Sequence, residues 1–263
     1  MNCLKNILIL ALVLGVSFAK AQEKSAAGLY NEGLSLLKAK DYSGGLVLME
    51  QALAKAGPED EKVSSLAKKN GAIAAYNAGN AKRKEGAHDE ALTLYNKGIE
   101  LNPTNSSNYE GVARAYEAKG DKTEAVKSYV VAANKGTEEG KADRAEKRLK
   151  QAQNIVGKLF VGKSYDEAIA TGEAFLSVKD DVAEVHYYVS RSLAETGSAE
   201  KALEHATKAI ELSGETVDDK YFYAQATQYE KLGNKADAIA SYKKITGDKY
   251  KSQAEYKISE LGG

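Results

Sequence analysis

The 263-residue chain is short of cysteine, tryptophan, proline and histidine. It contains one cysteine, no tryptophan, two prolines and three histidines. A single thiol, Cys3, cannot form an intrachain disulfide or build a multi-cysteine zinc site. The prolines are few, 43% of the residues are hydrophobic and 28% are charged. This composition is typical of a helix-rich globular chain rather than a disordered one.

Neither sign of charge is in excess. The chain carries 37 basic and 37 acidic residues. A nucleic-acid-binding protein usually shows a basic excess or a basic stripe, and neither is evident here. We therefore predict no nucleic-acid partner.

The sequence offers little for chemistry. His88, His186 and His205 are expected at three different structural positions, and none has a second histidine at the i+3 or i+4 spacing of two ligands on one helix face. His186 is expected to pack in the core. No glycine-rich phosphate loop follows a strand pattern, and no Gly-x-Ser-x-Gly elbow is present. We predict no catalytic residue, no metal and no cofactor; an enzyme would need a carboxylate-only mechanism, with groove acids such as Glu110 essential.

Residues 1–21 have the features of a secretory signal peptide. Lys5 precedes an apolar run over 7–16, and Ala19-Lys20-Ala21 forms a small-residue cleavage site. The run is shorter than the ~20 residues that cross a bilayer, which disfavours a membrane anchor. Cys3 precedes the run, whereas a lipid-acceptor cysteine would follow it. We predict cleavage after Ala21, export to the periplasm, and a mature chain with no integral membrane segment.

Cleavage would also change the net charge and the cysteine content of the chain. Loss of Lys5 and Lys20 leaves 35 basic and 37 acidic residues, a balance near −2. The mature chain would contain no thiol, so it could have neither a disulfide nor a cysteine nucleophile.

What the sequence does contain is a repeated pattern. Ala91 and Ala125 lie 34 residues apart, and so do Tyr95 and Tyr129. Small residues at such positions let two helices approach closely, and large ones fill the space beside them. A 34-residue period is that of a tetratricopeptide helix-turn-helix unit.

The pattern resembles the tetratricopeptide repeat family over most of the chain. The resemblance implies an all-α, right-handed superhelical solenoid of about six repeats that binds partners rather than performing chemistry. Repeats two, three, five and six match well. Repeat four is degenerate, with Gly172 and Phe175 where an aromatic and a small residue are expected, but its Ala168 lies 34 residues before Ala202.

Two insertions interrupt the rhythm, of about 12 residues before repeat two and about 9 before repeat four. The first begins with Gly57-Pro58 and the second covers the charge-dense segment 141–150, and both are expected to lengthen helix A of the following repeat. The mixed-sign charges favour a solvated helix face, with a docking surface as the alternative. We divide the chain into repeats 1–3 over 22–136 and repeats 4–6 with a capping helix over 137–263, as one continuous solenoid.

The capping helix is predicted from the spacing of three apolar residues. Ala254, Ile258 and Leu261 fall on one helical face, and Gly262 can end the helix. A repeat stack needs such a cap because its last helix would otherwise expose an apolar side.

The resemblance also implies a binding groove lined by helix A of each repeat. Carried over position by position, the groove residues are Tyr30, Leu34, Tyr76, Asn80, Arg83, Glu110, Arg114, Gln153, Gly157, Tyr187, Arg191, Tyr223 and Thr227. Four of them are tyrosines at one repeat position, which suits a binding surface but is also an ordinary stabilising feature of the repeat.

From these residues we predict a non-enzymatic scaffold or adaptor of the bacterial cell envelope that binds a protein or peptide segment in its groove. The alternative is a binder of a small ligand or cell-wall glycan, because tyrosines also stack on sugar rings. The family's lysine and asparagine clamp for a C-terminal carboxylate is not reproduced, since Tyr30 and Tyr76 stand where it would begin.

Overall fold

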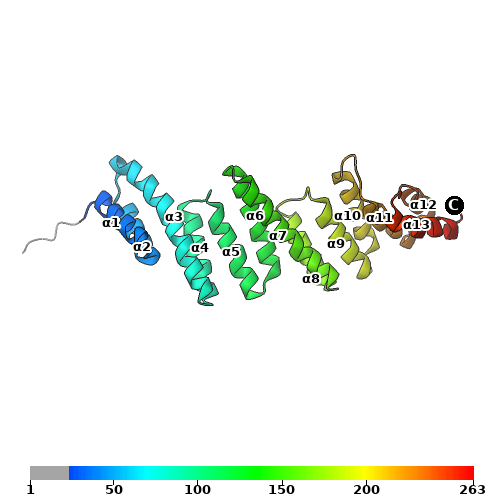
Figure 1. The fold of residues 1–263 in the computed structure, drawn as a ribbon, viewed down its shortest axis with the longest axis horizontal. Helices are drawn as coiled ribbons and strands as arrows, with labels where there is room; N and C mark the ends of the chain where they lie inside the picture. The colour runs from blue at the N-terminus through cyan, green and yellow to red at the C-terminus, as the bar shows by residue number, and fades with distance from the viewer. Residues whose placement is uncertain (1–23) are drawn as a thin grey trace, which may run out of the picture.

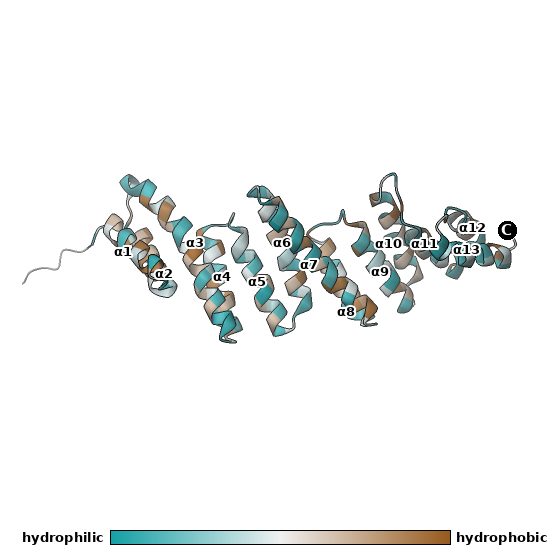
Figure 2. Cartoon of the chain, viewed as in Figure 1, coloured by the Kyte–Doolittle hydropathy of each residue, from teal (hydrophilic) through white to brown (hydrophobic). Residues whose placement is uncertain are grey.

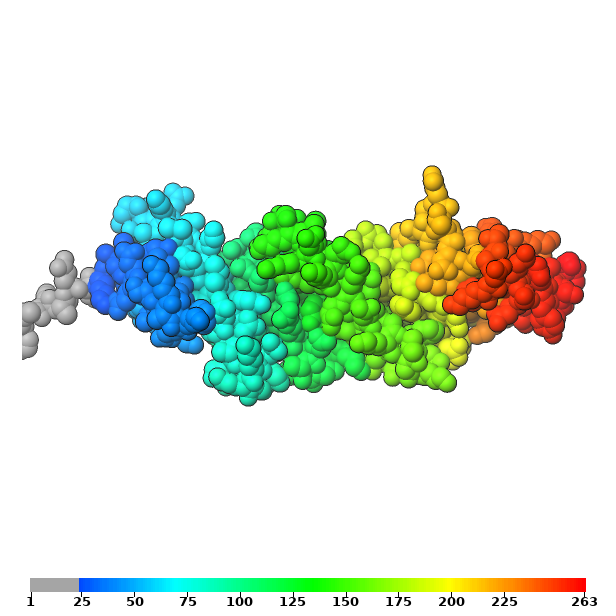
Figure 3. Space-filling model, in the orientation of Figure 1, coloured from blue at the N-terminus to red at the C-terminus, as the bar shows by residue number. Residues whose placement is uncertain are grey.

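The computed structural model describes residues 24–263, so the predicted signal peptide lies outside the described residues. This part of the chain forms an elongated array of helices (Figures 1 and 3). The helices are α1 Ala26–Lys38, α2 Tyr42–Lys55, α3 Glu61–Lys84, α4 His88–Leu101, α5 Ser106–Lys119, α6 Lys122–Glu138, α7 Ala142–Val161, α8 Tyr165–Leu176, α9 Ala183–Glu195, α10 Ala199–Leu212, α11 Asp219–Lys231, α12 Lys235–Tyr242 and α13 Asp248–Leu261. A short 3-10 turn, Pro58–Asp60, precedes α3.

The first twelve helices pair in chain order, so that each odd-numbered helix packs on the even-numbered helix that follows it. The six pairs correspond to the six predicted repeats, and α13 is left as the predicted cap. Hydrophobic and hydrophilic residues are interspersed along most helices (Figure 2). The all-α superhelical solenoid predicted from the sequence is confirmed.

The turn inside a repeat is set by local chemistry. In repeat three, Gly120 ends α5 with φ 83°, a left-handed conformation that costs glycine little. The Asp121 side chain then accepts a hydrogen bond from the Glu124 backbone N–H at 3.1 Å and begins α6. The Gly-Asp pair in the sequence therefore closes one helix and starts the next.

Both insertions lengthen helix A of their repeats, as predicted. α3 has 24 residues and α7 has 20, whereas α1 and α5 have 13 and 14. Pro58 lies in the 3-10 turn that leads into α3. The second extension adds a charged segment to the N-terminal part of α7.

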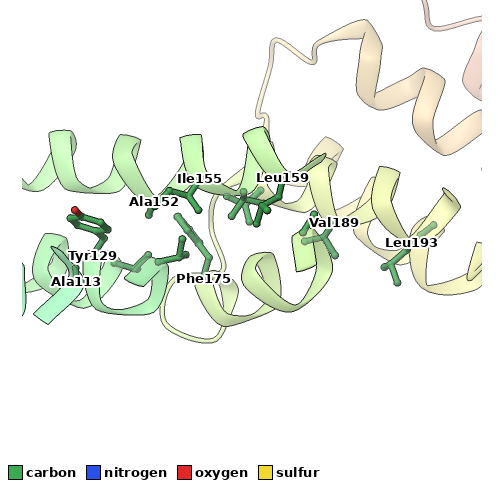
Figure 4. Packing of buried hydrophobic residues seen from close by; sticks show 14 of the residues in the cluster. Ala113, Tyr129, Ala152, Ile155, Leu159, Phe175, Val189 and Leu193 are labelled. Carbon is green, nitrogen blue, oxygen red and sulfur yellow. The ribbon is translucent and has the colours of Figure 1, made fainter. Parts of the chain in front are cut away.

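The largest apolar cluster runs from Ala113 in repeat three to Ala202 in repeat five (Figure 4). It therefore crosses the boundary between residues 136 and 137. Within residues 24–263, no helix combines the length and apolar character needed to span a membrane.

Repeat four packs well despite its departure from the family pattern. Phe175 is fully buried in this cluster. Gly172 lies against Val189, and a Cβ added there would overlap the Cγ2 atom of that valine. The aromatic residue, Phe175, therefore lies three positions later in α8 than the family pattern expects. Val189 of repeat five occupies the space that a side chain at position 172 would need.

The cap is built as predicted. Ala254 is buried, and Ile258 and Leu261 pack against the apolar cluster around Tyr242. Gly262 ends α13 with φ 86°. This helix covers the apolar side of repeat six.

Candidate functional site

The main pocket of the described chain lies along helix A of three successive repeats, α3, α5 and α7. Its volume is about 840 Å³, which is within the range of ligand-binding pockets. We call it the cationic groove, and its lining residues are Tyr76, Arg83, Glu110, Arg114, Glu117, Ala118, Tyr129, Arg144, Lys147, Arg148 and Gln151.

The lengthened part of α7 forms one wall of the cationic groove. Arg144, Lys147, Arg148 and Gln151 follow the i, i+3, i+4, i+7 spacing that places residues on one helical face. Asp143 and Glu146 lie on another face, beside a separate surface depression of about 560 Å³. Three basic residues of the mixed-sign segment, Arg144, Lys147 and Arg148, therefore face the groove, whereas Lys150 pairs with Glu146.

Glu110 and Arg148 form a buried ion pair between α5 and α7. The Arg148 side chain is only 4% exposed. Its Nε and Nη2 atoms donate to one carboxylate oxygen of Glu110 at 2.9 and 2.6 Å, and its Nη1 donates to the Ala132 carbonyl at 3.0 Å. Arg114 pairs with the other oxygen of Glu110. The expectation that 141–150 is simply a solvated face is wrong at Arg148.

Glu117 is the second carboxylate of the cationic groove, and it is also engaged within the protein. Tyr129 donates its hydroxyl to one oxygen at 2.7 Å, and Gln151 donates its side-chain amide to the other at 3.1 Å. Burial, together with the hydrogen bond to Glu117, raises the pKa of Tyr129. The phenol therefore stays protonated at neutral pH and keeps donating to the carboxylate.

The basic side chains that line the cationic groove outnumber the carboxylates available to pair with them. Five basic residues line it against two carboxylates. Among residues 24–263, Arg83, Arg144 and Lys147 form no ion pair within 4.0 Å. The Nε atom of Arg83 is buried and has no hydrogen-bond partner in this part of the chain. A buried donor left unsatisfied is costly.

Only some of the predicted groove residues come together in this pocket. Tyr76, Arg83, Glu110 and Arg114 all line it. Sequence reasoning missed the wall supplied by α7, although the i, i+3, i+4, i+7 spacing of its basic residues was readable. It also treated Tyr129 as a packing marker only, and its hydroxyl reaches the groove.

The predicted residues of repeat one and Asn80 are engaged in contacts inside the array. The Tyr30 hydroxyl accepts from the Asn70 side chain at 2.9 Å, and Leu34 packs in the apolar cluster around Met49. Asn80 accepts from the Tyr95 hydroxyl at 2.9 Å.

The predicted residues of repeats four to six lie outside the cationic groove. Gln153 is half-buried and Gly157 is buried beside Tyr188. Tyr223 packs on Tyr242 and Tyr250, with ring centroids 5.6 and 5.3 Å away. Thr227 donates back to the Ala224 carbonyl of its own helix at 2.8 Å.

Tyr187 is only 7% exposed. It packs among Phe160, Tyr188 and Tyr221, at centroid distances of 5.5 to 6.4 Å. The Arg191 guanidinium lies 5.7 Å from the centroid of Phe160 and 5.9 Å from that of Tyr187. Cation–π contacts of this kind hold the junction of repeats four and five together.

Two of the three histidines meet, although the sequence placed them apart. The Nδ1 atoms of His186 and His205 are 3.0 Å apart, and His186 Nε2 lies 2.9 Å from the Asp180 carbonyl oxygen. A carbonyl only accepts, so His186 carries its proton on Nε2 and accepts at Nδ1 from His205. His186 is buried, as predicted. In residues 24–263, no group of three or more His, Cys, Asp or Glu residues is arranged to hold a metal ion.

Because of this histidine pair, we expect the free energy of unfolding to fall at acidic pH. Burial lowers the pKa of His205 to about 4, and burial also lowers that of His186, with nearby Lys208 acting in the same direction and Asp180 against it. An unfolded histidine binds its proton near pH 6.5. The unfolded state therefore holds more protons between about pH 6.5 and 4, and the free energy of unfolding should fall by about 1–3 kcal/mol as the pH drops through that window.

Urea denaturation across that pH range measures the effect. His205→Gln should flatten the pH dependence. An unchanged pH dependence in His205→Gln would contradict the assignment to this pair.

A solenoid of paired helices whose A helices line a groove is typical of binding scaffolds. Comparison with known proteins points to the same class. A tetratricopeptide repeat family model matches residues 72–105, which are repeat two. Five further helix pairs repeat that arrangement, and the marker alanines lie 34 residues apart from Ala91 to Ala125 and from Ala168 to Ala202. The family model and the helix-pair fold together support the tetratricopeptide repeat family for this chain. Such proteins are in general non-enzymatic scaffolds for protein–protein interaction.

The similar solved structures are distant. They include the TPR2AB domain of yeast Sti1 from a complex with pHSP90, at 15% identity and TM-score 0.38, covering 90% of this chain and 98% of that one. The TPR domain of P58(IPK) has 18% identity and TM-score 0.37, with 90% and 64% covered. MamA from Desulfovibrio magneticus RS-1 has 19% identity and TM-score 0.34, with 66% and 92% covered. No curated protein matches the chain.

Proposed function

We propose that this protein is a non-enzymatic scaffold of the bacterial cell envelope that binds a segment of a partner protein in the cationic groove. The observation that carries the proposal is the pocket of about 840 Å³ along α3, α5 and α7, whose basic side chains exceed its acidic ones. Adjacent A helices form a continuous surface suited to an extended or helical segment.

Site-directed photo-crosslinking tests groove binding. A photoreactive amino acid replaces Gln151, which lines the cationic groove, or Lys127, an exposed residue on α6. Incubation with envelope extract should give crosslinked partner bands from position 151 and not from 127. The bands should be lost when Arg83→Ala and Lys147→Ala are combined in a folded variant. Equal crosslinking from both positions, or bands that survive the double variant, would contradict groove binding.

Export rests on the signal-peptide features of residues 1–21. Intact-mass measurement of the protein from a periplasmic fraction should give a chain that begins at Gln22. A chain that keeps Met1–Ala21 and stays in the cytoplasm would overturn the envelope assignment.

The second candidate, a binder of a small ligand or cell-wall glycan, is favoured by the presence of Tyr76 beside the polar side chains of a pocket of suitable size. Purified peptidoglycan and a panel of sugars separate the two proposals. Saturable glycan binding that depends on Tyr76 would replace the protein-partner proposal.

A further inference from the structure

We infer that the cationic groove selects an acidic peptide segment and holds the carboxylates of its Asp or Glu side chains with Arg83, Arg144 and Lys147. This inference rests on the proposed function, because it names the chemistry of the partner at the same site. The nearest negative charges of the protein itself do not satisfy these three cations.

Both groove carboxylates are committed to partners inside the protein. Glu110 is shared by Arg148 and Arg114, and Glu117 accepts from Tyr129 and Gln151. Arg148 is itself engaged and buried, since each of its three guanidinium nitrogens already donates to Glu110 or to a backbone carbonyl and its side chain is only 4% exposed. The charge left for a ligand is therefore positive.

The free cations lie on two walls of the cationic groove. Arg83 belongs to α3, while Arg144 and Lys147 belong to α7, and all three line the pocket. α5 lies between these helices in the array (Figure 1). A segment seated over α5 would meet cations on both sides. Tyr76 and Ala118 provide apolar contact area in the same pocket.

Two of the three cations come from the insertion before repeat four. Arg144 and Lys147 lie in segment 141–150, which lengthens α7 beyond the helix A of repeats one and three. The specificity is thus supplied by residues of the insertion, and it is directed at side-chain carboxylates rather than at a free C-terminus. Arginine and lysine donors form their strongest hydrogen bonds with carboxylates and phosphates.

The surrounding charges favour a peptide over a nucleic acid. Asp143 and Glu146 flank the basic face of α7, and Glu138 joins them beside the neighbouring depression. A long polyanion that tracked along the surface would leave the groove and meet these acids. A short acidic segment avoids them because it ends within the pocket.

The test uses the full mature chain and a fluorescein-labelled, C-terminally amidated peptide of alternating Glu and Ser. Fluorescence anisotropy should show saturable binding with one peptide per chain. The affinity should fall steeply between about 0.1 and 1 M salt, where the screening length shrinks from about 10 to 3 Å. Arg83→Ala with Lys147→Ala should weaken binding by roughly tenfold or more. The matched control removes two exposed lysines of α6 and α10, Lys127→Ala with Lys201→Ala, and should bind as the wild type does.

A peptide of alternating Lys and Ser, and a single-stranded oligonucleotide of equal charge to the acidic peptide, complete the design. Neither should compete with the acidic peptide. Tighter binding of the oligonucleotide, or equal loss in the control variant, would overturn the inference. If position 151 crosslinks a partner while the acidic peptide fails to bind, groove binding stands and the acidic specificity is wrong. If neither occurs, both fail.

Discussion

Replacing Arg148 by leucine is expected to lower the free energy of unfolding by about 2–3 kcal/mol. The substitution removes one hydrogen bond from the Ala132 carbonyl and two from the Glu110 carboxylate. Breaking a buried pair usually costs more, but Glu110 is 15% exposed and retains Arg114. Urea denaturation followed by circular dichroism measures the change as a shift in midpoint.

Arg144→Leu is the matched control for Arg148→Leu. It removes an arginine one turn earlier on the same face of α7, but one that is exposed and forms no ion pair in the described chain. Its effect should stay within about 0.5 kcal/mol. Combining Glu110→Leu with Arg148→Leu should restore part of the lost stability, since neither charge is then left unpaired. A wild-type midpoint in Arg148→Leu would contradict the role assigned to the pair.

The helical array was predictable because each of its determinants is local. The 34-residue spacing of Ala91 and Ala125 indicates packing within a helix pair, and Gly120-Asp121 indicates the turn between two helices. Even the two lengthened helices follow from spacing and from residues that favour helix. A solenoid unit contacts mainly its neighbours, so short-range patterns carry most of the fold.

The site was predictable only in part, because it depends on contacts between repeats. Arg114 and Glu110 were assigned to the groove from their positions in one helix. The partner of Glu110, Arg148, lies 38 residues later, and no spacing within a repeat indicates that pairing. Tyr187 was expected in the groove from its repeat position, yet it is buried because Phe160 and Tyr221 come from the neighbouring repeats. The contacts of side chains at repeat junctions can be identified only from the structure of the assembled repeats.

Phe175→Ala is expected to lower the free energy of unfolding by about 3–5 kcal/mol, more than Arg148→Leu does. The ring is fully buried in the cluster that joins repeats three, four and five. Its loss leaves a cavity that the surrounding helices fill only in part. Phe222→Ala, at a half-buried aromatic of repeat six, should cost less. Denaturation of the two variants in urea provides the comparison.

Gly172→Tyr combined with Phe175→Ala tests why repeat four departs from the family pattern. The double variant puts an aromatic and a small residue where that pattern expects them. We expect no rescue of Phe175→Ala, because the space beyond Gly172 is filled by Val189 of repeat five and a Cγ atom of Val156 lies 3.5 Å from where a Cβ would stand. Overpacking at such a site costs about 1–3 kcal/mol more. Wild-type stability in the double variant would mean that the family pattern, and not this pairing with Val189, governs the packing of repeat four.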